Sequence, residues 1–127
     1  MPIVKMKFFT REIVQARPDD IFVFGDNMYR AGFGGQAGAC RGEPNTLGIP
    51  TKFYPGMENH DFFSDNDFVE AKFFCDREFD KLIHYLSLGK TVILPADGLG
   101  TGLAELPTRA PKIYEYICKR LKELELI

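Results

Sequence analysis

Two short apolar runs, each followed at once by a glycine-rich stretch, constrain this chain more than any other feature. The runs are residues 21–24 and 91–94, and apart from Thr91 at the start of the second run every residue in them is apolar. Strands that are covered on both faces have this pattern, because both of their surfaces are buried. Such strands belong to parallel sheets with helices on each side. The sequence therefore predicts an α/β domain.

The segments around these two strands are expected to be mainly helical. Residues 67–88 carry an apolar stripe with helical spacing, which Gly89 can end. Further helices are expected over residues 10–16, over residues 35–41 and from residue 108, and further strands over residues 4–9 and 47–49. Pro50 is expected to stop the strand before it, and residues 54–64 are expected to form a surface loop. The stripe of the long helix comprises Phe68, Ala71, Cys75, Phe79, Leu82, Ile83 and Leu86. Strands that alternate with helices predict three layers around a mixed, mostly parallel sheet.

The 127 residues are enough for a single domain, which is expected to span residues 1–127. The 16 basic and 18 acidic residues give a net charge of −2, so no strong nucleic-acid-binding surface is expected. Neither a leader-like segment nor a run of about 20 apolar residues is present, which predicts a cytoplasmic protein without membrane contact. Cys40, Cys75 and Cys118 lack the spacing of a zinc site, and Cys75 and Cys118 are expected to be buried thiols.

The two glycine-rich stretches, residues 25–37 and 95–104, follow the carboxyl ends of the two buried strands. Ligands of open α/β sheets bind outside these strand ends, so the two loops are expected to border one crevice. Glycine lets the main chain approach a ligand closely and point successive N–H groups at an anion. Helices that start after each loop would add the positive ends of their dipoles. Together these features predict a site for phosphate or pyrophosphate, although neither loop matches a P-loop or a dinucleotide fingerprint.

Several side chains in these loops are candidates for ligand contacts. Asp26 or Asn27 can hydrogen-bond a base or a ribose hydroxyl, or can form a turn that leaves the strand. Phe33 can stack on the ligand or anchor the loop in the core, and Thr101 can donate its hydroxyl to phosphate. The predicted ligand-binding residues are Asp26, Asn27, Phe33, Gly34, Gly35, Gln36, Asp97, Gly98, Gly100, Thr101, Gly102 and Leu103.

Lys52 and Asp26 are the candidate catalytic residues. Lys52 follows Pro50-Thr51 at a strand end, where its amine can pair with phosphate or, with a lowered pKa, attack the anomeric carbon of a ribose. The alternative for Lys52 is a solvated lysine at a loop start. Asp97 and Glu105 can each serve as a base, or can be a turn former and a helix-start charge respectively. Neither a metal nor a cofactor is expected.

The loops resemble those of the macrodomains, a family that binds ADP-ribose, and the resemblance covers residues 21–116. It is carried by Gly25-Asp26-Asn27, by Gly34-Gly35-Gln36-Ala37 and by the loop from Pro95 to Gly102. Gly48-Ile49-Pro50-Thr51-Lys52 is similar to short macro-like proteins of phages and bacteria. The resemblance implies a macro-like fold and ADP-ribose, or a macromolecule that carries it, as the partner.

Thr51-Lys52 and Gly100-Thr101-Gly102-Leu103 also resemble the terminal ADP-ribose glycohydrolase branch of this family. That branch has a catalytic Asp where this chain has Ala104, and Glu105 comes one residue later. The resemblance therefore implies either hydrolysis of an ADP-ribosyl bond or a non-catalytic module that binds or sequesters the nucleotide. A phosphatase or nucleotidase on another α/β fold is a third alternative, which the lack of paired aspartates at a strand end disfavours.

Overall fold

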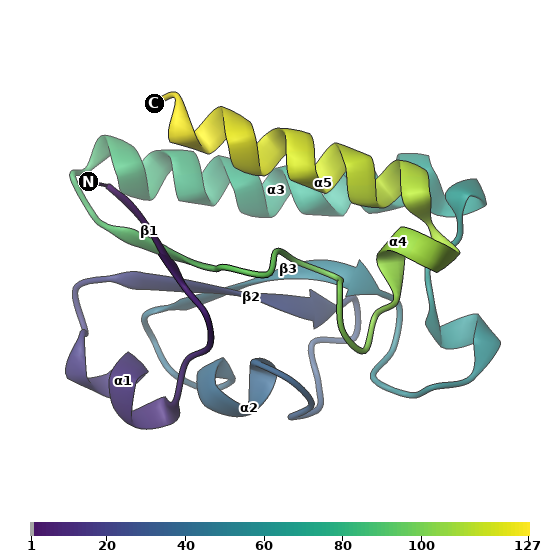
Figure 1. Ribbon diagram of the computed structural model, residues 1–127, viewed down its shortest axis with the longest axis horizontal. Coiled ribbons are helices and arrows are strands. Elements are labelled where there is room, and N and C mark those ends of the chain that lie inside the picture. Colours follow the sequence, from purple (N-terminus) through teal and green to yellow (C-terminus); the bar gives the residue numbers. More distant parts are fainter. Residues whose placement is uncertain (1) are drawn as a thin grey trace.

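The computed structural model describes residues 2–127 and shows a four-stranded sheet between two layers of helices (Figure 1). The strand order is β1-β4-β2-β3, and each neighbouring pair is parallel. The sheet is therefore fully parallel, whereas the sequence predicted a mixed, mostly parallel sheet. The strands are β1 (Ile3–Met6), β2 (Ile21–Asn27), β3 (Thr46–Lys52) and β4 (Val92–Pro95). The helices are α1 (Arg11–Ala16), α2 (Ala37–Cys40), α3 (Phe68–Ser87), α4 (Leu106–Arg109) and α5 (Pro111–Glu125), with 3₁₀ turns η1 (Asn59–Asp61) and η2 (Asp65–Asp67).

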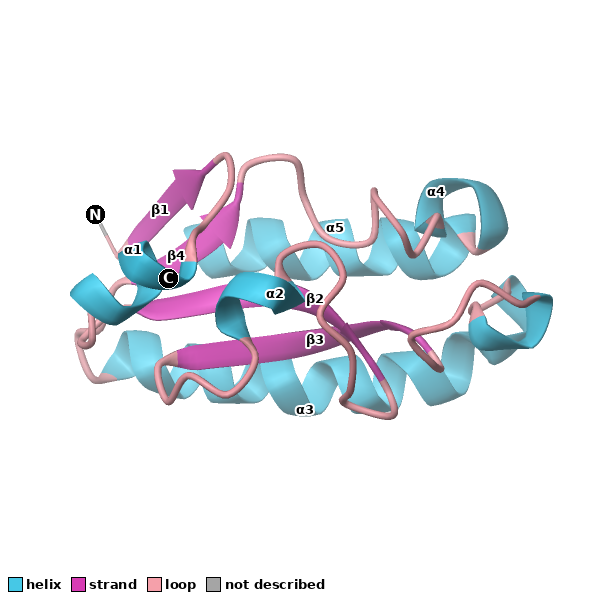
Figure 2. Cartoon of the chain, turned by 90° about the horizontal axis from the view of Figure 1, so that it is seen from below, coloured by secondary structure: helices cyan, strands magenta, loops and turns pink. Residues whose placement is uncertain are grey.

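The sheet has a hydrophobic core on each face, which confirms the three-layer α/β architecture. Side chains alternate between the two faces of a strand, so Ile21 and Val23 of β2 pack in the core under α3 and α5. Phe22 and Phe24 of the same strand pack in a smaller core with α1 and α2. Figure 2 shows the sheet from the side of α1 and α2, with α3 and α5 behind it.

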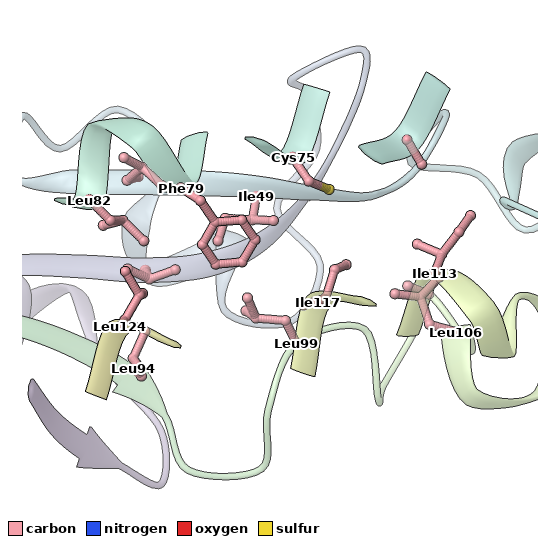
Figure 3. Packing of buried hydrophobic residues seen from close by; sticks show 14 of the residues in the cluster. Ile49, Cys75, Phe79, Leu82, Leu94, Leu99, Leu106, Ile113, Ile117 and Leu124 are labelled. Carbon is pink, nitrogen blue, oxygen red and sulfur yellow. The ribbon is translucent and has the colours of Figure 1, made fainter. Parts of the chain in front are cut away.

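The larger core is built where α3 and α5 lie side by side over the sheet. Cys75, Phe79 and Leu82 of α3 and Ile113 and Ile117 of α5 belong to one buried cluster, which Figure 3 shows from close by. All five residues are buried, and the helical stripe predicted this for the three on α3. No helix among residues 2–127 is long and apolar enough to span a bilayer.

The predicted burial of one member of the stripe, Ile83, is wrong. Ile83 is 38% exposed, whereas Glu78 lies buried on the same helix. A residue directly after a core position is turned by about 100° around a helix, and Ile83 directly follows the buried Leu82. Val69 and Phe73, which lie off the stripe, are exposed on α3.

Pro50 does not stop its strand, because β3 continues through it to Lys52. The reason is the strand order: β3 is an edge strand, where a missing N–H on the outer side costs no ladder hydrogen bond. β2 likewise runs past Gly25 to Asn27. Both strands therefore carry their last residues further toward the glycine loops than the sequence predicted.

Other element boundaries also differ from the sequence predictions. β1 ends at Met6 instead of residue 9, and α2 covers only Ala37–Cys40. The last helical region starts at Leu106 and is divided at Ala110 into α4 and α5. The predicted surface loop 54–64 is only partly at the surface, since Phe62 and Phe63 are buried. This segment folds back on the edge of the sheet through an antiparallel bridge between Lys52 and Phe62.

Candidate functional site

Parallel strands place all of their carboxyl ends at one edge of the sheet, and a cleft of about 270 Å³ lies at this edge. The glycine loops after β2 and β4 both border it, as predicted, and they follow strands that are neighbours in the sheet. Phe33 is the one predicted site residue outside the lining, and its side chain is 68% exposed. The predicted residues that line the cleft are Asp26, Asn27, Gly34, Gly35, Gln36, Lys52, Asp97, Gly98, Gly100, Thr101, Gly102 and Leu103.

Asp26, at the end of β2, is held by two arginines. Arg41 donates to both carboxylate oxygens, with Nη2 2.5 Å from Oδ1 and Nη1 3.3 Å from Oδ2. Arg30 donates to Oδ2 at 3.3 Å and to the carbonyl of Gly48 at 2.6 Å. A Cβ on residue 48 would lie 2.5 Å from Asp26 Oδ2, so only glycine leaves room for this carboxylate. The arrangement gives Asp26 a structural task, and its catalytic role stays a prediction.

Arg41 also lines the cleft, and the sequence prediction did not include it. Its Nε donates to the carbonyl of Gly32 at 2.7 Å and its Nη2 to the carbonyl of Ala31 at 3.1 Å. With Asp26 included, the guanidinium therefore ties the first loop to the end of β2. An arginine just after a short helix carries no local signal for this pairing, because its partners lie 9 to 15 residues away in the chain.

Two further predicted side chains are also engaged with the main chain. Asn27 donates through Nδ2 to the carbonyl of Ala31 at 2.7 Å, which matches the turn alternative. Gln36 accepts from the N–H of Phe9 and donates to the carbonyl of Phe9 at 3.2 Å. Both amides therefore shape the first loop. Gln36 also attaches that loop to the segment that follows β1.

Part of each glycine loop carries main-chain N–H groups that are not paired within the protein. In the structure of residues 2–127, the N–H groups of residues 32–37 and of residues 99–104 form no hydrogen bond to a protein acceptor. Gly98 and Gly100 adopt φ values of +85° and +80°, which L side chains rarely adopt. Successive free N–H groups in such a conformation form a concave anion site.

The expected help from helix dipoles is small. α2 and α4 follow the two loops, yet each has only four residues. A macrodipole grows from the alignment of many peptide units, so helices of this length add little to the potential in the cleft. The local N–H groups must therefore account for any attraction of an anion to these loops.

Close packing holds the two loops together. A Cβ on Gly25 would lie 3.5 Å from Thr51 Oγ1 and 3.8 Å from the Gly100 nitrogen, so β2, β3 and the second loop meet at this point. A Cβ on Gly100 would come within van der Waals overlap of the Leu106 side chain, which packs directly beneath the loop. Thr101 donates its hydroxyl to the carbonyl of Asp97 at 3.2 Å, which closes the tip of the second loop.

Lys52 lies at the β3 end of the cleft and is only 6% exposed. Its Nζ donates to the carbonyl of Gly56 at 2.6 Å and lies 4.3 Å from the centre of the Phe62 ring. Within residues 2–127, no carboxylate oxygen lies within ion-pair distance of this amine. Burial lowers the pKa of Lys52, against the negative charges of Asp61 and Glu105, which raise it.

The carboxylates near the second loop are placed differently from one another. Asp97 is exposed at the loop, and Glu105 adopts a left-handed φ of +51° and pairs with Arg109 at 3.1 Å. Ala104, where the glycohydrolase branch has an acid, is buried in the lining. Among residues 2–127, no group of three or more His, Cys, Asp or Glu side chains is arranged to hold a metal ion.

Comparison with known proteins gives a family but no annotated relative. No curated protein matches this chain. No solved structure matches it either. A family model described as a family of unknown function, DUF7831, matches residues 4–120. This match covers the sheet except for Ile3, together with both glycine loops, and the chain therefore belongs to the DUF7831 family.

Proposed function

We propose that this protein binds ADP-ribose or a related nucleotide in the cleft, with the diphosphate held by the two glycine loops. One observation carries the proposal: the N–H groups of residues 32–37 and 99–104 form no hydrogen bond within the protein, and all of these residues except Phe33 line the same cleft. Amides in a cleft partly shielded from water bind an anion more strongly than the same groups in bulk water. A diphosphate presents enough oxygens to accept from both runs at once.

The macro-like fold is part of the same proposal. The loop resemblance supports it, and a parallel sheet with helices on both faces agrees with it at the coarser level of fold class. The resemblance is also what favours ADP-ribose over other diphosphates, since the N–H groups alone recognise phosphate and not the remainder of the ligand.

In the same proposal, Lys52, which lines the β3 end of the cleft, acts on the end of the ligand nearest to it. In the proposed reaction, its amine attacks the anomeric carbon of the distal ribose, a C–N bond forms, and the bond to the ADP-ribosylated atom breaks. The leaving group takes the proton that the attacking amine gives up, and one water then cleaves the C–N bond, adds its hydroxyl group to the anomeric carbon and returns its proton to the amine. A lowered pKa supports this role, because the uncharged amine is the nucleophilic form.

A non-catalytic binding module is the second candidate, and a specific observation favours it. The buried Ala104 offers no acid or base where the glycohydrolase branch has its Asp. The carboxylate of Asp26 is occupied by Arg41 and Arg30. In this alternative, the protein captures the nucleotide or a modified partner and releases it unchanged.

Calorimetric titration with ADP-ribose, NAD and AMP tests the binding proposal. We expect ADP-ribose to saturate the site and AMP, which lacks the diphosphate, to bind more weakly. The absence of saturation by all three at millimolar concentration would rule out this class of ligand.

Incubation with ADP-ribosylated protein and DNA separates the two candidates. The enzyme is supported if the wild-type protein releases ADP-ribose and Lys52→Ala does not. Lys119→Ala, at an exposed position on α5, is the control and should still release it. Tight binding by the wild-type protein without any release supports the binding module.

A further inference from the structure

The segment after β1 forms a wall of the cleft that the loop motifs did not indicate. Lys7 and Phe8 both line the cleft, and the Phe8 side chain is 65% exposed there. In the described chain, residues 2–127, the ion pairs leave Lys7 without a carboxylate partner, unlike the nearby Lys5, which pairs with Glu125. An exposed aromatic ring and a free cation therefore lie together at the rim.

The strand order places this segment at the opposite end of the cleft from Lys52. Along the carboxyl edge of the sheet, the order is the end of β1, the loop after β4, the loop after β2 and the end of β3. Neighbouring strands are about 4.8 Å apart, so the two outer strands are separated by roughly 14 Å. A diphosphate on the two middle loops would have Lys52 on one side and Phe8 on the other.

The position of Phe8 is set by contacts on both sides of it. Before it, the N–H of Ala96 donates to the carbonyl of Met6 at 2.9 Å. After it, Phe9 is buried, packs edge-on against Phe22 at 5.1 Å between ring centres, and is paired through its main chain with Gln36. The Phe8 ring is thus presented at the rim by an anchored segment, so little backbone entropy is lost when a ligand covers it.

The polar groups expected to recognise a base are already engaged. Asp26 is held by its two arginines, and Asn27 is bonded to the Ala31 carbonyl. A flat, exposed ring recognises a base by stacking, which requires no free hydrogen-bonding group. We propose that Phe8 stacks on the base of the bound nucleotide while Lys7 pairs with the adjoining phosphate. This inference rests on the proposed function, and it assigns the nucleoside to the β1 end of the cleft.

Three probes divide the ligand into its parts: ADP-ribose, ADP and inorganic pyrophosphate. We expect Phe8→Ala to weaken the binding of ADP-ribose and of ADP by about tenfold, the scale of one base stacked on an aromatic ring. The affinity for pyrophosphate should be unchanged. Phe8→Tyr keeps the ring and should keep the affinity, whereas Phe8→Leu keeps only the apolarity and should lose it. Phe73→Ala is the matched control, because Phe73 is 60% exposed on α3 and does not line the cleft.

Lys7→Gln should weaken the binding of all three probes by a similar factor and make it less dependent on salt concentration. Its control is Lys119→Gln, at an exposed position on α5. If the wild-type protein binds none of the probes, the proposed function fails and this inference fails with it. Two results would overturn this inference alone, provided that the wild type binds ADP-ribose. In the first, Phe8→Ala binds ADP as tightly as the wild type does. In the second, Phe8→Ala loses as much affinity for pyrophosphate as for ADP. An unchanged affinity in Lys7→Gln overturns the role of Lys7.

Discussion

Arg41 and Asp26 form a two-pronged ion pair at the base of the first glycine loop, with Nη2 2.5 Å from Oδ1 and Nη1 3.3 Å from Oδ2. The carboxylate side chain is 3% exposed and the arginine 17%. The same guanidinium also donates to the carbonyls of Ala31 and Gly32, and Arg41 directly follows α2. The pair therefore connects the end of β2, the first glycine loop and the end of α2. The shape of the first glycine loop therefore depends on one buried charge pair.

Arg41→Gln should lower the free energy of unfolding by about 2–4 kcal/mol, since removal of one partner leaves a buried charge poorly compensated. Arg30 still faces Asp26 in this variant, which keeps the loss below the largest values for such pairs. Urea denaturation followed by circular dichroism measures the difference. Arg17→Gln is the control, because its pair with Asp20 is more exposed and should contribute less than about 1 kcal/mol. Equal losses in the two variants would contradict a structural role for the buried pair.

Gly100→Ala and Gly102→Ala should differ sharply although both lie in the second loop. At Gly100, φ is +80° and a Cβ would overlap the Leu106 side chain, whereas nothing lies within 4 Å of a Cβ at Gly102. We expect Gly100→Ala to lower the free energy of unfolding by about 2–4 kcal/mol through strain and overpacking. Gly102→Ala should leave that free energy within about 0.5 kcal/mol of the wild type. Thermal and urea denaturation of both variants test this contrast, and a similar stability for both would disprove the packing at Gly100.

Cys40 and Cys75 should be unreactive in the folded protein. Burial raises the pKa of each thiol to about 12, so both are almost entirely protonated at pH 8, and the thiolate is the reactive form. Cys118 is only half-buried. A chromogenic disulfide reagent should therefore modify at most one thiol in the native protein and all three in urea.

Cys118→Ser provides the control for this measurement, since the native variant should show almost no rapid reaction. Fast modification of two or more thiols in the folded wild-type protein would show that Cys40 or Cys75 is accessible.

The fold class and the meeting of the two glycine loops were predictable from the sequence because both follow from short-range patterns. The apolar runs within residues 21–24 and 91–94 indicate parallel strands, and parallel strands place their carboxyl ends together. The continuation of β3 through Pro50 was not predictable, because tolerance of a proline depends on whether the strand lies at an edge. Strand order is set by contacts distant in the chain, which no local window contains.

The parts of the site that were missed also depend on distant partners. Gln36 was predicted to bind the ligand, yet its amide pairs with Phe9, 27 residues away. Arg41 and Lys7 had no motif to mark them, and they line the cleft only because of where α2 and β1 lie in the assembled fold. Phe33, flanked by glycines in the sequence, lies outside the lining of the cleft.

Lys52 should make the stability of the protein depend on pH in a direction opposite to that of a salt-bridged lysine. Burial lowers its pKa in the folded state from the ordinary value of 10.5. Between the lowered value and 10.5, the unfolded chain binds more protons than the folded one, so the free energy of unfolding rises with pH across this window. Below the window, the cost of burying the charge is fully present and constant. Lys52→Met removes this titration and leaves every other group in place.

The difference in unfolding free energy, wild type minus Lys52→Met, should therefore increase as the pH is raised from 7 toward about 10.5. Urea denaturation at four or five pH values within this range measures it, and groups common to both proteins cancel in the subtraction. Lys119→Met, at an exposed position on α5, should show no such trend relative to the wild type. A difference that stays constant or falls with pH would mean that the amine of Lys52 is not desolvated. It would thereby remove the physical basis for proposing this lysine as the nucleophile.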